Sequence, residues 1–165
     1  MNRVMVGLGA NISDPLEQLT TAHCNLAQHS DLAITATSSV YVSPPHGPQD
    51  QPDFFNAVVT LATSLAPDAL LGLLLATEDA MGRQHKRKWG ERCIDLDLLI
   101  YDDLNIHTES LVIPHPRAHE RRFVLDPLIE LLGAQFELPG KGALGQLQAQ
   151  CADQKIRVLC EFPGC

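Results

Sequence analysis

The segment from Cys93 to Tyr101, CIDLDLLIY, most strongly limits how this chain can fold. Side chains alternate between the two faces of a β-strand. One face is then apolar and the other carries two carboxylates: the first is expected to hold Ile94, Leu96, Leu98 and Ile100, the second Asp95, Asp97, Leu99 and Tyr101. Such a strand must bury its apolar face, and the two acids need a chemical explanation.

The remaining pattern predicts what this strand packs against. Residues 4–10, 34–41 and 55–63 favour strands, and residues 104–113 favour a short hairpin. Helices are expected from Pro15 onwards, over 67–81 and over 123–132, with a further helix in 140–150 and a last strand in 155–159. This order predicts an α+β fold with a ferredoxin-like, mainly antiparallel sheet covered by helices.

The helix expected over 67–81 has a clear apolar stripe. Pro67 suits a first helical turn and Gly82 suits the position after the last turn. The stripe is expected to consist of Leu70, Leu71, Leu74 and Met81. Glu78 is then expected on the border of the stripe.

Composition excludes several classes of protein. The chain has 165 residues and a net charge of −8, which predicts one domain over 1–165 and opposes binding to nucleic acid or anionic membranes. No apolar run approaches the ~18 residues of a membrane span, and the N-terminal sequence lacks a secretion signal. The five cysteines form no close pair, so we expect free thiols and a cytoplasmic location.

Charge is unevenly distributed along the chain. Residues 1–82 carry eight acids and one base, whereas residues 83–122 carry seven acids and eight bases. The bases of this middle part are Arg83, Lys86, Arg87, Lys88, Arg92, Arg117, Arg121 and Arg122. Cations concentrated beside acids in an acidic protein predict a site for a small, highly charged anion. The alternative is a solvated basic loop.

Asp95 and Asp97 are the candidate metal ligands. Two residues apart on a strand, they point to the same side, with Cα atoms roughly 6 to 7 Å apart. Mg²⁺ typically takes one or two protein carboxylates and completes its shell with water and phosphate oxygens. Two such ions could be bridged by this pair. The alternative is a pair of acids bound to Arg92 or to backbone amides.

Several neighbours suit phosphate binding. Arg83, Lys88, Arg92 and Arg121 could neutralise charge that develops on a transferring phosphoryl group. Trp89 could close over the ligand, or could simply pack in the core. His115, between two prolines, could donate a hydrogen bond to phosphate, or could serve only the turn.

A second kind of site is expected beside the loop 43–53, which contains four prolines and a glycine. Long ordered loops in small domains are usually functional. Phe54 and Asn56 alternate to one side of the following strand, and Phe123 starts a helix. Two aromatic rings could sandwich a flat heterocycle while Asn56 reads its polar edge; alternatively, both rings belong to the core.

Four segments together resemble the 6-hydroxymethyl-7,8-dihydropterin pyrophosphokinase (HPPK) family of folate biosynthesis. They are LGANISDP, SVYVSPPHGPQDQPDFFNAVVTLAT, GRQHKRKWGERCIDLDLLIYDD and LVIPHPRAHERRFVLDPLIEL. The resemblance runs in unbroken order over about 3–133. It implies a three-layer αβα fold and a protein that is usually monomeric. It also implies transfer of the β,γ-diphosphoryl group of ATP to the pterin hydroxymethyl group, which leaves AMP.

The resemblance also implies roles for single residues. Asp95 and Asp97 correspond to ligands of two Mg²⁺ ions, and Arg83 and Arg92 to catalytic loop residues. The ATP-binding set comprises Glu78, Lys88, Trp89, His115 and Arg121. The pterin-binding set comprises Ser43, Pro44, His46, Phe54, Asn56 and Phe123.

The sequence departs from the family pattern at several positions. Ala10 replaces Ser, Phe54 replaces the common Tyr and Cys93 the common Thr. In the basic loop, the departures are His85, Lys88 and Glu91. Phe keeps the stacking surface of Tyr, but Lys cannot reproduce a bidentate guanidinium contact. The loop changes leave open a non-catalytic relative that binds pterin or nucleotide. The same acids and bases also leave open a metal-dependent phosphodiesterase or nuclease, which the net charge opposes.

Overall fold

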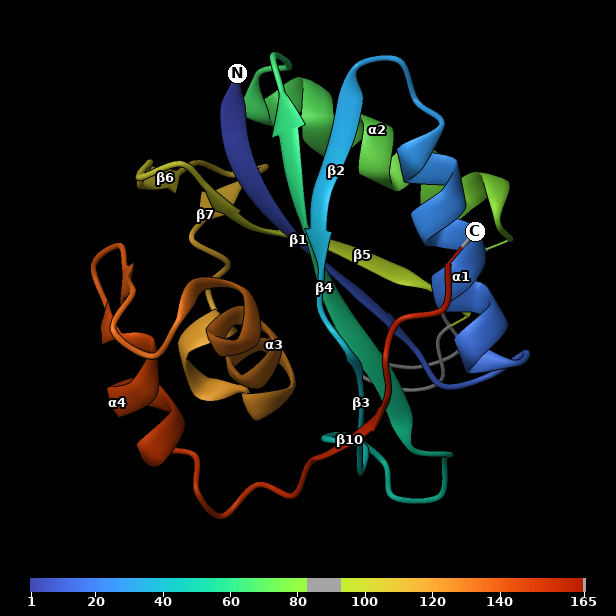
Figure 1. Ribbon diagram of the computed structural model, residues 1–165, viewed down its shortest axis with the longest axis vertical. Coiled ribbons are helices and arrows are strands. Elements are labelled where there is room, and N and C mark those ends of the chain that lie inside the picture. The colour runs from blue at the N-terminus through green and yellow to red at the C-terminus, as the bar shows by residue number, and fades with distance from the viewer. Residues whose placement is uncertain (83–92, 165) are drawn as a thin grey trace.

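The computed structural model describes residues 1–82 and 93–164. Figure 1 shows a twisted sheet with helices on both faces. Its strands run in the order β10-β3-β4-β1-β5, with β2 also paired to β4, and every pairing is antiparallel. The strands are β1 (Asn2–Ala10), β2 (Leu32–Thr37), β3 (Val40–Ser43), β4 (Phe54–Thr63), β5 (Asp95–Tyr101) and β10 (Arg157–Cys160). The expected α+β fold with an antiparallel sheet is confirmed.

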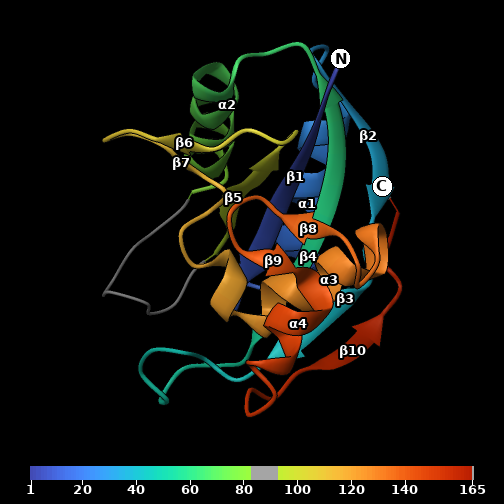
Figure 2. The same cartoon turned by 90° about the vertical axis from the view of Figure 1, so that its left-hand side faces the viewer.

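Two helical layers cover the sheet. The helices α1 (Pro15–Ala27) and α2 (Pro67–Ala80) pack on one face, and α3 (Arg122–Leu132) and α4 (Leu144–Ala149) on the other (Figure 2). The first core contains Leu19, Leu26, Leu70 and Leu74, and the second contains Leu125, Leu128 and Leu144. Short elements lie in the connections: β6 (Ile106–His107), β7 (Val112–Ile113), a 3-10 turn (Ala118–Glu120), β8 (Glu137–Leu138) and β9 (Gly142–Ala143).

The central strand β1 shows how alternation builds the two cores. Val4, Val6 and Leu8 are buried against the layer of α1 and α2. Met5 belongs to the opposite core, and Gly7 and Gly9 follow on that side by alternation. At positions 7 and 9, β1 therefore has no side chain on the α3 side.

The alternation expected for β5 is interrupted by a bulge. Val6 of β1 pairs with Leu98, whereas Met5 pairs with Ile100, so Leu99 is the extra residue. Beyond it Ile100 joins the core on the α3 side and Tyr101 the core on the α1 and α2 side. The prediction for these last two residues was wrong, because an inserted residue reverses the phase of a strand. Asp95 and Asp97 precede the bulge and keep their expected face.

The strand expected over 34–41 is split into β2 and β3 at two serines. The Val58 N–H donates to Ser38 Oγ at 2.9 Å, and the Ser38 N–H donates to the Val58 carbonyl at 2.9 Å. Because a side-chain oxygen takes the place of a backbone partner, the chain changes direction here. The long strand β4 pairs with β2 along one half and with β3 along the other.

The helix boundaries follow local chemistry. α1 begins at Pro15, and Asp14 caps it by accepting a hydrogen bond from the Glu17 N–H at 3.3 Å. α2 begins at Pro67, and Gly82 beyond its end has a φ of 77°, as expected of a glycine after a helix. Glu78 was expected on the border of the α2 stripe. It lies within the stripe and is buried, as Leu70 and Leu74 are.

The proline loop 44–53 is held against the end of β1. The Asn11 amide, which is buried, donates to Gln51 Oε1 at 2.9 Å and to the Pro52 carbonyl at 3.0 Å. Gln51 Nε2 in turn donates to the Pro48 carbonyl at 2.9 Å. These bonds satisfy loop carbonyls that proline-rich segments leave without N–H partners.

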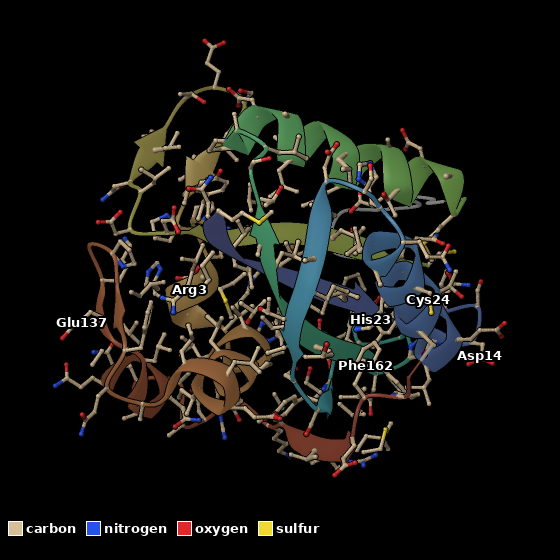
Figure 3. The ribbon with its side chains drawn as sticks, turned by 45° about the horizontal axis from the view of Figure 1, so that its top comes forward. Arg3, Asp14, His23, Cys24, Glu137 and Phe162 are labelled. Atoms are coloured by element: carbon tan, nitrogen blue, oxygen red, sulfur yellow. The ribbon has the colours of Figure 1, made fainter. Side chains whose placement is uncertain are left out.

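The C-terminal segment crosses the sheet edge and reaches α1. β10 pairs with β3, and the Phe162 ring then packs on His23 of α1 at 4.7 Å between ring centroids (Figure 3). Cys24, beside His23, is disulfide-bonded, whereas Cys93, Cys151 and Cys160 are free. The expectation of free thiols is therefore wrong for Cys24. In the part of the chain that the structure describes, no helix is long and apolar enough to cross a membrane.

Glu130 of α3 joins this helix to the start of β3. Its carboxylate accepts hydrogen bonds from the Ser39 N–H at 3.0 Å, the Ser39 hydroxyl at 3.1 Å and the Tyr41 hydroxyl at 2.7 Å. Glu130→Ala should lower the free energy of unfolding by about 1 to 2 kcal/mol, since three hydrogen bonds to a partly exposed charge are lost. Urea denaturation measures this change. Glu137→Ala, at an exposed carboxylate on β8, is the matched control; equal losses in both variants would contradict the role given to Glu130.

Candidate active site

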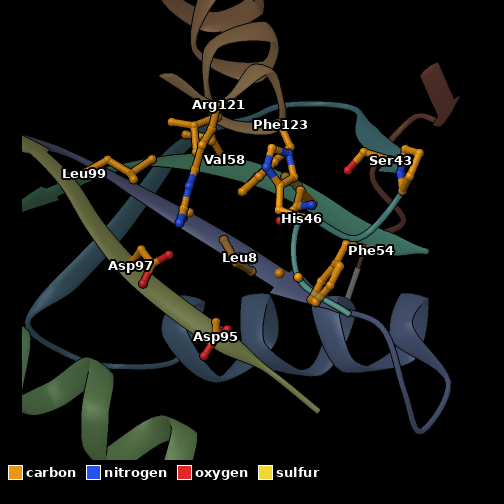
Figure 4. Close-up of a pocket in the computed structure, with 17 residues that line it drawn as sticks. Leu8, Ser43, His46, Phe54, Val58, Asp95, Asp97, Leu99, Arg121 and Phe123 are labelled. Carbon is orange, nitrogen blue, oxygen red and sulfur yellow. The ribbon is translucent and has the colours of Figure 1, made fainter. Parts of the chain in front are cut away.

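A cavity of about 120 Å³ opens on the α3 side of the sheet. Strands β1, β4 and β5 form its floor, and the proline loop and the start of α3 form its walls (Figure 4). Its lining consists of Gly7, Leu8, Gly9, Ser43, Pro44, His46, Gly47, Phe54, Asn56, Ala57, Val58, Asp95, Asp97, Leu99, Arg121, Phe123 and Val124. Segments far apart in the sequence thus meet at one site.

Asp95 and Asp97 form the acidic wall of the cavity. Their cross-strand neighbours on β1 are Gly9 and Gly7 respectively. Because neither neighbour has a side chain, β1 places nothing over the two carboxylates on this face of the sheet. The pair is therefore directed into the cavity, as Figure 4 shows.

Arg121 enters the same cavity from the residue that precedes α3. Burial lowers the pKa of its guanidinium, and the negative charge of Asp97 opposes this shift. An arginine side chain stays protonated in proteins even when buried. The cavity thus contains a fixed cation facing two carboxylates, the combination that a phosphate bound through a divalent cation requires.

Aromatic rings line the other side of the cavity. Phe54 opens β4, and Phe123 lies in the first turn of α3. His46 from the proline loop packs on Phe123 at 5.1 Å between ring centroids with an interplanar angle of 73°, and the Arg121 guanidinium lies 5.4 Å from the same ring. Burial, and then the charge of Arg121, lower the pKa of His46. This end of the cavity suits a flat, uncharged ring system.

Two buried polar groups in the lining have no hydrogen-bond partner among the described residues: Ser43 Oγ and Asn56 Nδ2. A buried polar group without a partner costs free energy, so such groups in a cavity wall point to a polar ligand. Asn56 depends on Gly9, because a Cβ built at Gly9 would lie 2.6 Å from Asn56 Oδ1. Only glycine leaves the Asn56 amide this position.

His115 lies next to the cavity and is held as a neutral ring. The backbone N–H of His115 donates to the Leu99 carbonyl at 2.9 Å, and the ring Nδ1 accepts from the backbone N–H of Arg117 at 3.2 Å. Burial, with smaller contributions from Arg121 and Arg117, lowers the pKa of His115 to about 4. Because Nδ1 accepts a hydrogen bond, the proton of the neutral ring is on Nε2, which remains able to donate.

The residues present fit divalent cations of the Mg²⁺ type. Among the described residues, no group of three or more His, Cys, Asp and Glu side chains is placed to hold a metal ion. Mg²⁺ does not need such a cage, because water and substrate phosphates complete its octahedron around one or two carboxylates. Asp95 and Asp97 offer such a carboxylate pair in the open wall of the cavity.

The cavity brings together most of the residues expected from the sequence. Nine line it: Ser43, Pro44, His46, Phe54, Asn56, Asp95, Asp97, Arg121 and Phe123. Glu78 and His115 are described by the structure but do not belong to this lining. Arg83, Lys88, Trp89 and Arg92 lie outside the described residues.

Sequence reasoning missed the floor of the cavity. Gly7 and Gly9 lie opposite the two acids, and Leu99, which alternation had placed on the face of the acids, lines the cavity with them. The glycine spacing in GLG was a usable signal, since alternation puts both glycines on one face. The role of Leu99 as a bulge residue has no signal in the sequence that we recognise.

The neutral state of His115 predicts a pH dependence of stability. Between pH 6.5 and about 4 the unfolded chain binds a proton at His115 that the folded chain does not. Stability therefore falls as the pH is lowered through this interval, by up to about 1.4 kcal/mol per pH unit for this residue. His115→Gln should remove that part of the slope in urea denaturation measured across the interval, whereas His107→Gln on β6 should not. An unchanged slope in His115→Gln would contradict the assignment.

Comparison with known proteins gives a consistent result. The model of the family described as 7,8-dihydro-6-hydroxymethylpterin-pyrophosphokinase (HPPK) matches residues 5–133. The chain is 43% identical over 151 residues to the 2-amino-4-hydroxy-6-hydroxymethyldihydropteridine pyrophosphokinase of Haemophilus influenzae, which covers 92% of this chain and 94% of the relative. It is also 43% identical over 130 residues to the Bacillus subtilis protein of the same name, covering 79% of this chain and 78% of that one.

Solved structures share the fold. The crystal structure of Plasmodium falciparum HPPK-DHPS with pteroate superposes with a TM-score of 0.71 at 14% identity. The superposition covers 90% of this chain and 42% of the longer one, so this chain spans less than half of that protein. The family model and the two bacterial relatives each match most of this chain. The chain therefore belongs to the HPPK family.

Proposed function

We propose that this protein transfers the β,γ-diphosphoryl group of ATP to the hydroxymethyl group of 6-hydroxymethyl-7,8-dihydropterin, giving AMP and the pterin diphosphate. The observation that carries the proposal is the composition of one cavity. Two carboxylates and an arginine lie at one end, and aromatic rings with two unpartnered polar groups lie at the other. A phosphate-bearing substrate and a flat, polar-edged heterocycle fit these two ends.

The pterin is proposed to bind between Phe54 and Phe123. Their rings supply stacking surface, which is worth about 0.5 to 1.5 kcal/mol per aromatic pair beyond area burial. Ser43 Oγ and Asn56 Nδ2 are available to the polar edge of the ring. Pro44 and His46 complete the wall on the loop side.

ATP is proposed to bind at the acidic end with two Mg²⁺ ions held by Asp95 and Asp97. The chemistry that Mg²⁺ supplies when bound there is neutralisation of phosphate charge and a lower pKa for the attacking hydroxyl. Arg121 contacts the phosphates, and the Nε2–H of His115 donates to a phosphate oxygen. In this proposal Arg83 and Arg92 are catalytic and Lys88 and Trp89 bind ATP, as the family resemblance implies.

The chain's own residues then act by positioning. The pterin hydroxymethyl oxygen forms a bond to the β-phosphorus, the bond from that phosphorus to the oxygen bridging to the α-phosphate breaks, and AMP leaves. The hydroxyl proton is released in the same exchange. Phe54 and Phe123 hold the nucleophile in place while Arg121 holds the phosphates, so the two substrates meet in one cavity. No covalent intermediate on the protein is needed.

Domain organisation, oligomeric state and location also belong to the proposal. We propose a single domain over 1–165 that acts as a monomer in the cytoplasm and does not bind nucleic acid.

A direct experiment tests the proposed reaction: AMP should accumulate only when ATP, the pterin and Mg²⁺ are all present. Release of AMP without the pterin would indicate a phosphodiesterase, and binding of both ligands without AMP would indicate a non-catalytic relative.

Asp97→Ala should reduce AMP formation by at least about 100-fold, because a carboxylate that holds the metal near the transferring phosphoryl group is lost. Chromatographic measurement of AMP gives the rate, and circular dichroism checks the fold. Asp103→Ala, at an exposed acid just beyond the same strand, should keep the wild-type rate. A near-normal rate in Asp97→Ala would remove the metal assignment.

Gly9→Ala should weaken pterin binding by about 10-fold or more, since the new Cβ displaces the Asn56 amide and a lost polar contact costs about 1 to 3 kcal/mol. Titration calorimetry with the pterin measures the affinity. Gly7→Ala is the matched control, because its nearest neighbour is the flexible end of Leu99 at 3.3 Å. If both variants bind the pterin equally well, Gly9 does not position Asn56.

A further inference from the structure

Glu78 is a buried carboxylate inside an otherwise apolar helix stripe. It lies on α2 one turn after Leu74, which itself follows Leu70 by one turn, and only 3% of its surface is exposed. Both leucines belong to the core between α2 and the sheet. A carboxylate is rarely buried in such a place unless it is bound by a specific partner.

One such partner is the backbone of β5. Glu78 Oε2 accepts a hydrogen bond from the Leu96 N–H at 2.6 Å, across the contact between α2 and β5. Among the strands that the structure describes, β5 is the last of its sheet and pairs only with β1. An edge strand has amide groups without a second strand to receive them, and Glu78 receives one of these.

This amide lies between the two acids that line the cavity. Leu96 lies between Asp95 and Asp97, and Asp95 is the first residue of β5. Leu96 faces the α1 and α2 core, whereas its two neighbours line the cavity on the opposite face. A bond that fixes the Leu96 peptide therefore fixes the rotation of the strand about its axis, and with it the direction of both carboxylates.

We propose that Glu78 is a positioning residue for the acid pair: it anchors the start of β5 so that Asp95 and Asp97 present their carboxylates together to the metal-bound nucleotide. This inference rests on the proposed function and deepens it. It gives Glu78 a role through the backbone of β5, in place of the direct contact with ATP that the family resemblance implies. A glutamine would keep the acceptor oxygen and lose the charge, whereas a leucine would lose both.

The test compares E78L and E78Q with the exposed control D79L, using two readouts that do not depend on turnover. The first is hydrogen exchange at the Leu96 amide, followed by NMR. The second is titration of Mg²⁺ with a non-hydrolysable ATP analogue, alongside titration of the pterin alone. In E78L the amide should exchange at least about 100-fold faster and the nucleotide analogue should bind at least about 10-fold more weakly, with pterin affinity within about threefold of wild type. E78Q and D79L should stay within about threefold in both titrations and keep the Leu96 amide protected.

Two outcomes overturn the inference. One is a folded E78L with wild-type exchange at Leu96 and wild-type nucleotide affinity. The other is an E78Q that loses nucleotide affinity by tenfold while its Leu96 amide stays protected, since the charge and not the anchor would then matter. If E78L does not fold, E78Q alone decides between support and rejection by the same criteria. AMP formation by the wild-type protein tests the proposed function separately.

Discussion

Strand β5 has one apolar face and one face that carries two acids, and the rest of the structure depends on this difference. Ile94, just before the strand, and Leu96 and Leu98 within it are buried in the core beneath α1 and α2, so the strand cannot rotate without exposing apolar surface. The same burial turns Asp95 and Asp97 toward the α3 side. Packing on one face thus determines where charge lies on the other, and the position of the acidic wall follows from the hydrophobic core.

The position of Arg121 and the rings depends on the second core. α3 is held to the sheet by Leu125 and Leu128, and its first turn carries Phe123 into the cavity with Arg121 just before it. The proline loop approaches from the other side and is fixed by Asn11 and Gln51. Together with the burial of β5, these two packing contacts therefore converge on one site.

The sequence predicted the sheet and the helices, and period-two alternation grouped Asp95 with Asp97 and Phe54 with Asn56. The other five predicted residues of the cavity lining came from the basic cluster, from the start of a helix and from the family resemblance. The sequence did not reveal the bulge at Leu99, which reverses the strand for Ile100 and Tyr101. Helical periodicity also did not show that Glu78 lies inside the apolar stripe and not on its border. Its burial depends on the Leu96 amide of a strand distant in sequence. Cys24 shows the same limit, because disulfide formation depends on distances in the folded chain that spacing alone does not give.

The central claim is that the acid pair of β5 and the two rings serve one reaction in one cavity. A crystal structure of the protein with Mg²⁺, a non-hydrolysable ATP analogue and the pterin tests it most directly. The account predicts divalent ions on Asp95 and Asp97 that also contact the phosphates, with the pterin ring between Phe54 and Phe123. A nucleotide bound elsewhere, with both carboxylates free of metal, would contradict it.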